Sequence, residues 1–127
     1  MAKPEPAQKL ILRDQRRALH AYEAVSAVAK DERDEYRTAV NDLGANILRG
    51  GLCAALAATQ RLGKRGGDIL IGHLAIAGVP GLESVPPQEL ARRVRELDAD
   101  SYMIATREVL QVATWLKRAV QATFEGA

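Results

Sequence analysis

The sequence predicts an all-α fold, a compact single-domain bundle of about six helices in which the first and last helices are long. The 127 residues are 47% hydrophobic but only 4% aromatic, and they are rich in Ala, Leu, Arg and Glu, which favours helices. The alternating patterns typical of strands are nearly absent. Residues 101–124 contain neither Gly nor Pro and carry apolar residues at helical spacing.

The length predicts one domain, at residues 9–127, preceded by a mobile tail at residues 1–8 that contains two prolines. The tail lacks the apolar core of a signal peptide. The longest apolar stretch, residues 69–79, is about half a membrane span, so we expect no membrane segment. Cys53 stands alone in an apolar run and is expected to be a buried, inert thiol of a cytoplasmic protein.

The first helix is expected from residue 8 or 9 to about Lys30, with two contrasting faces. One line of the helical wheel is apolar and is predicted to be core; it consists of Ile11, Ala18, Tyr22, Val25 and Ala29. The opposite line is basic, with no acid at its centre; it consists of Lys9, Arg13, Arg16, Arg17 and His20. Cations without an acidic partner repel one another, which favours an external anion on this face.

The next two helices are bounded by acids and glycines. Asp31 is a plausible N-cap for a second helix that runs to about residue 42, where Gly44 is expected to break or kink it. A third helix is expected at residues 45–62. Gly50 and Gly51 lie inside it, and because glycine is unfavourable in a helix, they predict close approach of another helix backbone.

The second half of the chain alternates turns with helices. Residues 63–67 form a flexible basic turn, and Asp68 is expected to cap a fourth helix at residues 69–77. Residues 78–87 are a loop rich in Gly and Pro, and a fifth helix follows at residues 87–97. Asp98 or Asp100 is expected to cap the last helix.

The last helix is apolar on more than one flank. Its predicted core stripe consists of Tyr102, Ala105, Val109, Ala113, Leu116, Val120 and Phe124. Ile104 and Trp115 lie on a different flank. A helix that is apolar nearly all round is either central to its domain or pressed against a partner. We therefore predict that Ile104 and Trp115 dock another subunit, with a core tryptophan as the alternative for Trp115.

Catalytic groups are not apparent in the sequence. His20 and His73 are the only histidines, and neither has a second His or Cys at a spacing that suits zinc. We expect His20 to be solvated and His73 to be hydrogen-bonded and partly buried. The acids of residues 31–35 follow one another and cannot face one point on a helix, and residues 63–67 lack the phosphate-loop pattern. We predict no catalytic residues, metal, cofactor or small-molecule substrate, and no enzyme.

Basic residues give the clearest functional indication, although the net charge is only +2. The helical wheel nominates Arg13 and Arg16, and the basic turn nominates Lys64 and Arg65, as contacts to RNA phosphates. Few aromatic residues are available to stack on bases, which favours contact with the backbone. The alternatives are an ordinary solvated face, or a helical protein–protein adaptor whose arginines pair with acidic partners and which has no nucleic-acid role.

Three groups of residues resemble a known family. The run from Tyr102 through Thr106-Arg107-Glu108 to Trp115-Leu116-Lys117-Arg118 is similar to the C-terminal signature of the small helical subunit of type III-B CRISPR effector complexes, the Cmr complexes. Arg17 and Tyr22 occur in a long first helix, as in that family. Residues 46–52 (NILRGGL) resemble its isoleucine-led turn into Gly-Leu. The similarity extends over residues 9–124.

The resemblance implies a non-catalytic scaffold subunit in antiviral defence. Members of that family stack as several copies beside the crRNA-binding backbone of the complex and help to line the channel for the guide–target duplex. Its implied partners are other effector subunits, copies of itself, and crRNA and target RNA. By position, it adds Arg17, Arg49, Lys117 and Arg118 as expected RNA contacts.

Overall fold

The computed structural model describes residues 11–124, and the expected tail at residues 1–8 lies outside them. The described residues form six α-helices and two short 3₁₀ helices, and no strand. The α-helices are α1 (Arg13–Ser26), α2 (Arg33–Gly50), α3 (Leu52–Leu62), α4 (Gly67–Ala75), α5 (Leu90–Glu96) and α6 (Ala99–Phe124). The 3₁₀ helices are η1 (Lys30–Glu32) and η2 (Pro87–Glu89). The all-α prediction and the long last helix are confirmed.

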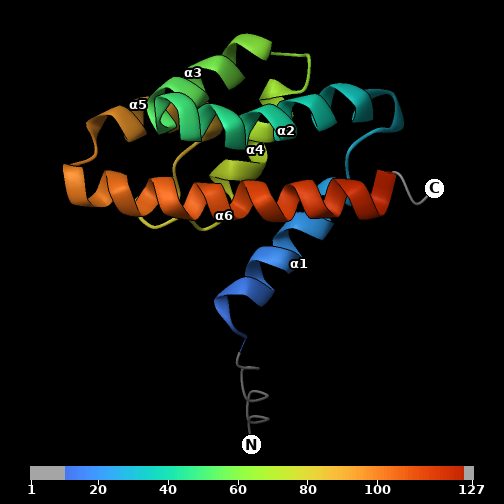
Figure 1. Ribbon diagram of the computed structural model, residues 1–127, viewed down its shortest axis with the longest axis horizontal. Coiled ribbons are helices and arrows are strands. Elements are labelled where there is room, and N and C mark those ends of the chain that lie inside the picture. The colour runs from blue at the N-terminus through green and yellow to red at the C-terminus, as the bar shows by residue number, and fades with distance from the viewer. Residues whose placement is uncertain (1–10, 125–127) are drawn as a thin grey trace, which may run out of the picture.

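Helix α6 organises the bundle. In Figure 1 it runs along the length of the molecule, α2 lies beside it, and α1 crosses it and then projects away from the body. Its 26 residues extend over about 39 Å. The predicted core stripe of α6 is confirmed except at Tyr102, which is only partly buried. Its buried members are Ala105, Val109, Ala113, Leu116, Val120 and Phe124. Helices α3, α4 and α5 pack on the α2 side of the bundle.

The division between α2 and α3 was predicted at the wrong glycine. Helix α2 continues through Gly44, where an added Cβ would meet nothing within 4 Å, and the chain breaks at Gly51. Gly51 has a φ of 89°, a backbone conformation that residues other than glycine rarely adopt. The close approach expected there is not another helix backbone but the hydroxyl of Tyr102, which would lie 3.3 Å from a Cβ at Gly51. That hydroxyl accepts a hydrogen bond from the Cys53 N–H at 3.1 Å.

The basic turn between α3 and α4 is tightly packed rather than flexible. A Cβ at Gly66 would lie 2.7 Å from the carbonyl oxygen of Glu35, and one at Gly67 would lie 2.1 Å from the carbonyl oxygen of Thr59. Only glycine fits such contacts without a shift of the backbone. Helix α4 therefore begins at Gly67 with Gly66 at its N-cap, and the side chain of Asp68 does not cap it.

Helix α1 buries a different line from the one predicted. It ends at Ser26 rather than near Lys30, and its buried residues are Arg17, Ala21, Ala24 and Val25. Of the expected stripe, Tyr22 is 43% exposed, and Ile11 and Ala18 are only partly buried. The reason is the way α1 packs on α6, which buries the line through Arg17 and Ala21 instead. In Figure 1 the start of α1 also projects beyond the body.

The start of α6 follows the local sequence rules. The Ser101 N–H donates a hydrogen bond to Asp98 Oδ1 at 2.8 Å, so Asp98 is the cap, as one of the two expected alternatives. The same bond lowers the pKa of Asp98. The predicted loop is also confirmed, since residues 78–86 contain no helix before η2 begins at Pro87. Helix α5 is shorter than expected and begins only at Leu90.

Candidate nucleic-acid interface at the crossing of α1 and α6

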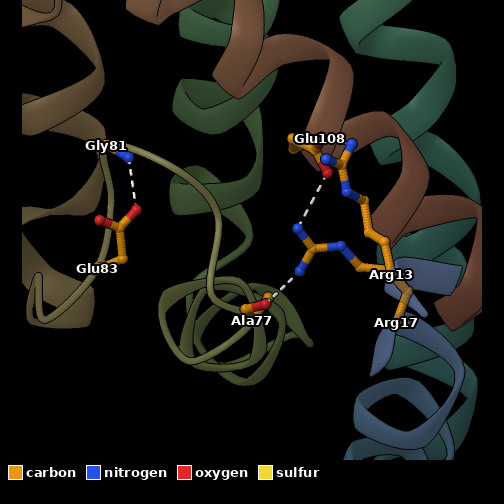
Figure 2. Close-up of polar contacts among 6 residues, drawn as sticks. All are labelled: Arg13, Arg17, Ala77, Gly81, Glu83 and Glu108. Atoms are coloured by element: carbon orange, nitrogen blue, oxygen red, sulfur yellow. Dashed lines mark hydrogen bonds and ion pairs between the residues drawn. The ribbon is translucent and has the colours of Figure 1, made fainter. Parts of the chain in front are cut away.

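A buried carboxylate holds two arginines at the crossing. Glu108 of α6 is buried, and its Oε2 accepts a hydrogen bond from Arg17 Nη2 at 3.0 Å. Its Oε1 accepts one from Arg13 Nη1 at 2.9 Å. Arg17 Nη1 also donates to the carbonyl oxygen of Ala77, just after the end of α4. Figure 2 shows both arginines of α1 reaching Glu108, with Arg17 lying between it and Ala77.

The expectation of a basic face without an acidic partner was therefore wrong. The acid comes from α6, which lies far away in the sequence but packs directly on α1. Arg17 is buried and fixes α1 to α6 and to the end of α4. A buried ion pair is costly to break, because the remaining charge is left without a partner. Arg17 thus has a structural role, whereas Arg13 keeps 64% of its side chain exposed and Arg16 is exposed.

Two hollows lie on either side of Arg13. The first hollow, of about 240 Å³, lies between α1, α6 and the loop after α4; it is lined by Arg13, Arg16, Arg17, Ala77, Gly78, Pro80 and Glu108. The second hollow lies along α6; it is lined by Arg13, Asp14, Gln111, Thr114, Trp115 and Arg118. Four arginines and two carboxylates therefore line the two hollows, which gives this surface an excess of positive charge.

The side chains of Trp115 and Arg118 contact each other in the second hollow. The guanidinium carbon of Arg118 lies 4.9 Å from the centroid of the Trp115 ring, within the range of a cation–π contact. Trp115 is partly buried and packs against the core, while Arg118 is exposed. The structure thus brings together four of the predicted RNA-binding residues, Arg13, Arg16, Arg17 and Arg118, with Trp115 beside them.

The other predicted contacts lie elsewhere. Arg49 is in the last turn of α2, and Lys117 is on α6, and both are exposed. Lys64 and Arg65 are exposed in the turn between α3 and α4, which Figure 1 places on the opposite side of α6 from the start of α1. Arg65 lines a shallow hollow together with Asp34 and Glu35. Those carboxylates weaken the attraction of this turn for a phosphate.

An exposed apolar group lies on the first turns of α6. Ile104 is 46% exposed and its neighbour Met103 is 63% exposed. The hydrogen bond from Cys53 to Tyr102 joins this part of α6 to the start of α3. The predicted docking residue Ile104 is therefore accessible, whereas Trp115 is partly covered by Arg118.

The two histidines lie near one another, and both are partly buried. The Tyr36 hydroxyl is 2.7 Å from His73 Nδ1, and the two rings make an edge contact with centroids 5.3 Å apart. The prediction for His73 is confirmed. Burial, helped by the nearby His20, lowers the pKa of His73 to about 4. His20 was expected to be solvated, but it is half-buried, and burial lowers its pKa as well.

Glu108 is the site residue that sequence reasoning missed. It lies four residues after Ile104 and seven before Trp115, so it shares their flank of the helix. An acid in the middle of an apolar flank indicates a buried partner of opposite charge, and that signal was available. Within residues 11–124 no cluster of three or more His, Cys, Asp or Glu side chains is arranged to hold a metal ion. No helix in this part of the chain is long and apolar enough to cross a membrane.

The chain is similar to known proteins over most of its length. Residues 13–123 match the family model described as "CRISPR-associated protein (Cas_Cmr5)". The chain is 39% identical over 110 residues to the CRISPR system Cmr subunit Cmr5 of Thermus thermophilus, with 85% of this chain and 92% of that protein covered. It is 31% identical over 110 residues to the Cmr5 subunit of Thermotoga maritima, covering 84% and 80% of the two chains.

The fold has a solved counterpart as well. The X-ray crystal structure of a CRISPR-associated Cmr5 family protein from Thermus thermophilus superposes with a TM-score of 0.76 at 35% sequence identity. The match covers 88% of this chain and 97% of that one. The helical arrangement described above is therefore similar to that of a family member over nearly the whole length of that member.

Proposed function

This chain belongs to the CRISPR-associated Cmr5 family, and from that premise we propose that it is a structural, non-catalytic subunit of a type III-B Cmr complex that binds RNA through phosphates. Its partners are other subunits of the complex and copies of itself. The RNA is crRNA or target RNA, and the setting is antiviral defence in the cytoplasm.

The observation that carries the RNA-binding role is the pair of hollows that share Arg13 at the crossing of α1 and α6. Arg16 and Arg118 lie one in each hollow and are exposed. The guanidinium group is planar and presents several N–H donors that suit phosphate oxygens. A strand that followed the crossing would meet Arg16, Arg13 and Arg118 in turn, which is a geometry for backbone contact.

The chemistry of the crossing favours contact with phosphates over reading of bases. Among the described residues, Trp115 is the one aromatic residue that lines either hollow; it lies in the second, where Arg118 lies over its ring. Arginine contacts to phosphates position a protein on RNA but carry no sequence information directly. A subunit that supports many different guides needs such sequence-independent contacts.

The remaining predicted cations form a secondary set in this proposal. Arg49 and Lys117 are exposed and retain the RNA contact implied by their positions in the family motifs. Lys64 and Arg65 are accessible too, but Arg65 shares its hollow with two carboxylates. We therefore rank the crossing first and the turn between α3 and α4 last.

Self-association allows the arginines of several copies to bind the same RNA. Ile104 and Met103 offer exposed apolar surface for the neighbouring copy, and Ile104 is the stronger docking candidate because Trp115 is partly covered. Copies stacked at a regular interval repeat the arginine cluster along the RNA. Linked weak contacts then add up to tight binding, which a single subunit of net charge +2 does not need to provide alone.

The proposal is tested in the reconstituted effector complex with bound crRNA. The double variant Arg16→Ala/Arg118→Ala is compared with Arg93→Ala, an exposed arginine of α5, by measuring target-RNA affinity at several salt concentrations. Each lost phosphate contact per subunit lowers the log–log salt slope by about 0.7 to 0.9. An unchanged slope in the double variant, with normal complex assembly, contradicts RNA binding at the crossing and favours the adaptor function.

A further inference from the structure

We propose that the first hollow, between α1, α6 and the loop after α4, is a binding pocket for a single phosphate group. The proposal deepens the proposed function, because it assigns the point at which one phosphate of the RNA is held. It rests on that function only for the source of the phosphate. The pocket itself is argued from the buried charges around it.

The first argument is a buried cation with an unused donor. The side chain of Arg17 is only 9% exposed, and it lines the hollow. Its two terminal nitrogens donate to Ala77 and Glu108, whereas its Nε is buried without an acceptor among the described residues. Buried donors are almost always satisfied. An anion in the hollow would supply the missing acceptor.

The second argument is the local charge balance. Among the described residues, three arginines line the hollow and Glu108 is the single acid. Glu108 Oε1 engages only one terminal nitrogen of Arg13, whose side chain is largely exposed. Within residues 11–124, the remaining donors of Arg13 and all of the Arg16 guanidinium group have no acidic partner and are available to an anion. Charge-assisted hydrogen bonds from arginine to phosphate are among the stronger polar contacts in proteins.

The third argument is the shape of the pocket. Its volume of about 240 Å³ is below the range of roughly 300–1,000 Å³ that drug-sized ligands occupy, which suits a phosphate group with water rather than a whole nucleotide. Gly78 forms part of the wall, and a Cβ added to it would meet nothing within 4 Å. The nearby carbonyl oxygen of Ala77 already accepts from Arg17, which reduces its repulsion of an anion.

The test is a titration of the full chain with inorganic phosphate at constant ionic strength, maintained with chloride. The readout is the ¹H–¹⁵N NMR signal of the Arg17 Nε–H group. We expect a saturable shift that chloride alone does not produce. Arg16→Ala removes an exposed arginine from the pocket wall and is expected to weaken phosphate binding roughly tenfold, while Arg93→Ala leaves it unchanged.

Two further variants sharpen the result. Arg13→Ala is expected to weaken binding as Arg16→Ala does, and Glu108→Gln is expected to strengthen it, because the competing carboxylate charge is removed. If Glu108→Gln fails to fold, the two exposed arginines decide the question. A shift that does not saturate, that chloride reproduces, or that persists unchanged in both Arg16→Ala and Arg13→Ala overturns the pocket.

A second titration distinguishes the source of the phosphate, using a short oligouridine that has no terminal phosphate. The same Arg17 shift with this RNA supports a backbone phosphate as the ligand. A shift with inorganic phosphate alone supports a free or terminal phosphate. RNA binding in the reconstituted complex without any Arg17 response to either ligand overturns the pocket and leaves the proposed function standing. If the full chain binds phosphate but Arg16→Ala leaves the RNA affinity of the reconstituted complex unchanged, the result supports the pocket and counts against the proposed function.

Discussion

Arg17 and Glu108 form a buried ion pair, with Nη2 and Oε2 3.0 Å apart, between helices that are brought together from positions 91 residues apart in the chain. Because both side chains are almost fully buried, the pair fixes where α1 crosses α6. That crossing in turn determines where Arg13, Arg16 and Arg118 lie relative to one another. The geometry of the candidate RNA interface therefore depends on this buried contact.

Removal of Arg17 is predicted to destabilise the fold. Arg17→Ala leaves Glu108 buried with only Arg13 as a partner and leaves the Ala77 carbonyl without its donor. Breaking a buried pair in this way costs about 3–5 kcal/mol, which urea denaturation followed by circular dichroism will measure. The exposed neighbour Arg16→Ala is the control and is expected to change the free energy of unfolding by less than about 0.5 kcal/mol. A loss below about 1 kcal/mol for Arg17→Ala would contradict the structural role.

Two glycine substitutions are predicted to have opposite effects. Gly67→Ala places a Cβ 2.1 Å from the carbonyl oxygen of Thr59, so α3 and α4 must separate, and we expect a loss of at least about 2 kcal/mol. Gly44→Ala meets no atom within 4 Å inside α2, and should stabilise by roughly 0.5–1 kcal/mol. Thermal unfolding of the two variants, made in the same background, compares them directly. Equal effects would show that the turn before α4 is not tightly packed.

These glycines show what the sequence could predict. Most of the core stripe of α6, a cap at Asp98 or Asp100 and a loop at residues 78–87 were predicted from short-range spacing. The structure agrees, with Asp98 as the cap and with η2 beginning at Pro87. The choice between Gly44 and Gly51 as the helix break could not be made locally. It depends on a left-handed φ at Gly51 and on the Tyr102 hydroxyl, which comes from a helix much further along the chain.

The candidate site was predictable only in part, for the same reason. Periodicity placed Arg13, Arg16 and Arg17 on one side of α1, but it could not show that Glu108 would neutralise part of that side. It also assigned Tyr22 to the core, although the packing of α1 on α6 buries the line through Arg17 and Ala21 instead and leaves Tyr22 43% exposed. A helical wheel gives the faces of a helix, whereas tertiary contacts decide which of them is covered.

Substitution of Ile104 is predicted to affect assembly rather than folding. Ile104→Glu puts a charge on exposed apolar surface, and we expect it to weaken self-association or incorporation into the Cmr complex roughly tenfold, as for a central interface residue. Ile76→Glu is the matched control, since Ile76 is also exposed but lies at the end of α4. Light scattering of the isolated chain and subunit stoichiometry of the complex measure the effect. Normal stoichiometry for Ile104→Glu would exclude this surface as the contact between copies.

The stability of the fold is predicted to fall as the pH drops from about 6.5 to about 4. Burial holds the pKa of His73 at about 4, against 6.5 for a free histidine, so in this window the unfolded chain binds a proton that the folded chain does not. His20 contributes in the same direction, because burial lowers its pKa too. The contribution of neutral His73 to the free energy of unfolding is complete above about pH 6.5 and is lost as the pH approaches 4.

The size of this loss is limited by solvent. A shift from 6.5 to about 4 corresponds to at most about 3 kcal/mol, and because His73 is only partly buried, we expect roughly 1–2 kcal/mol. His73→Asn places an amide group where Nδ1 lies, so it keeps a hydrogen-bond partner for the Tyr36 hydroxyl but cannot be protonated. Its free energy of unfolding should therefore vary less with pH than that of the wild type. The difference between the two urea-denaturation series, taken at intervals from about pH 4 to about pH 7, removes the contribution of the carboxylates that titrate in both. Parallel curves for the two proteins would show that folding does not lower the pKa of His73.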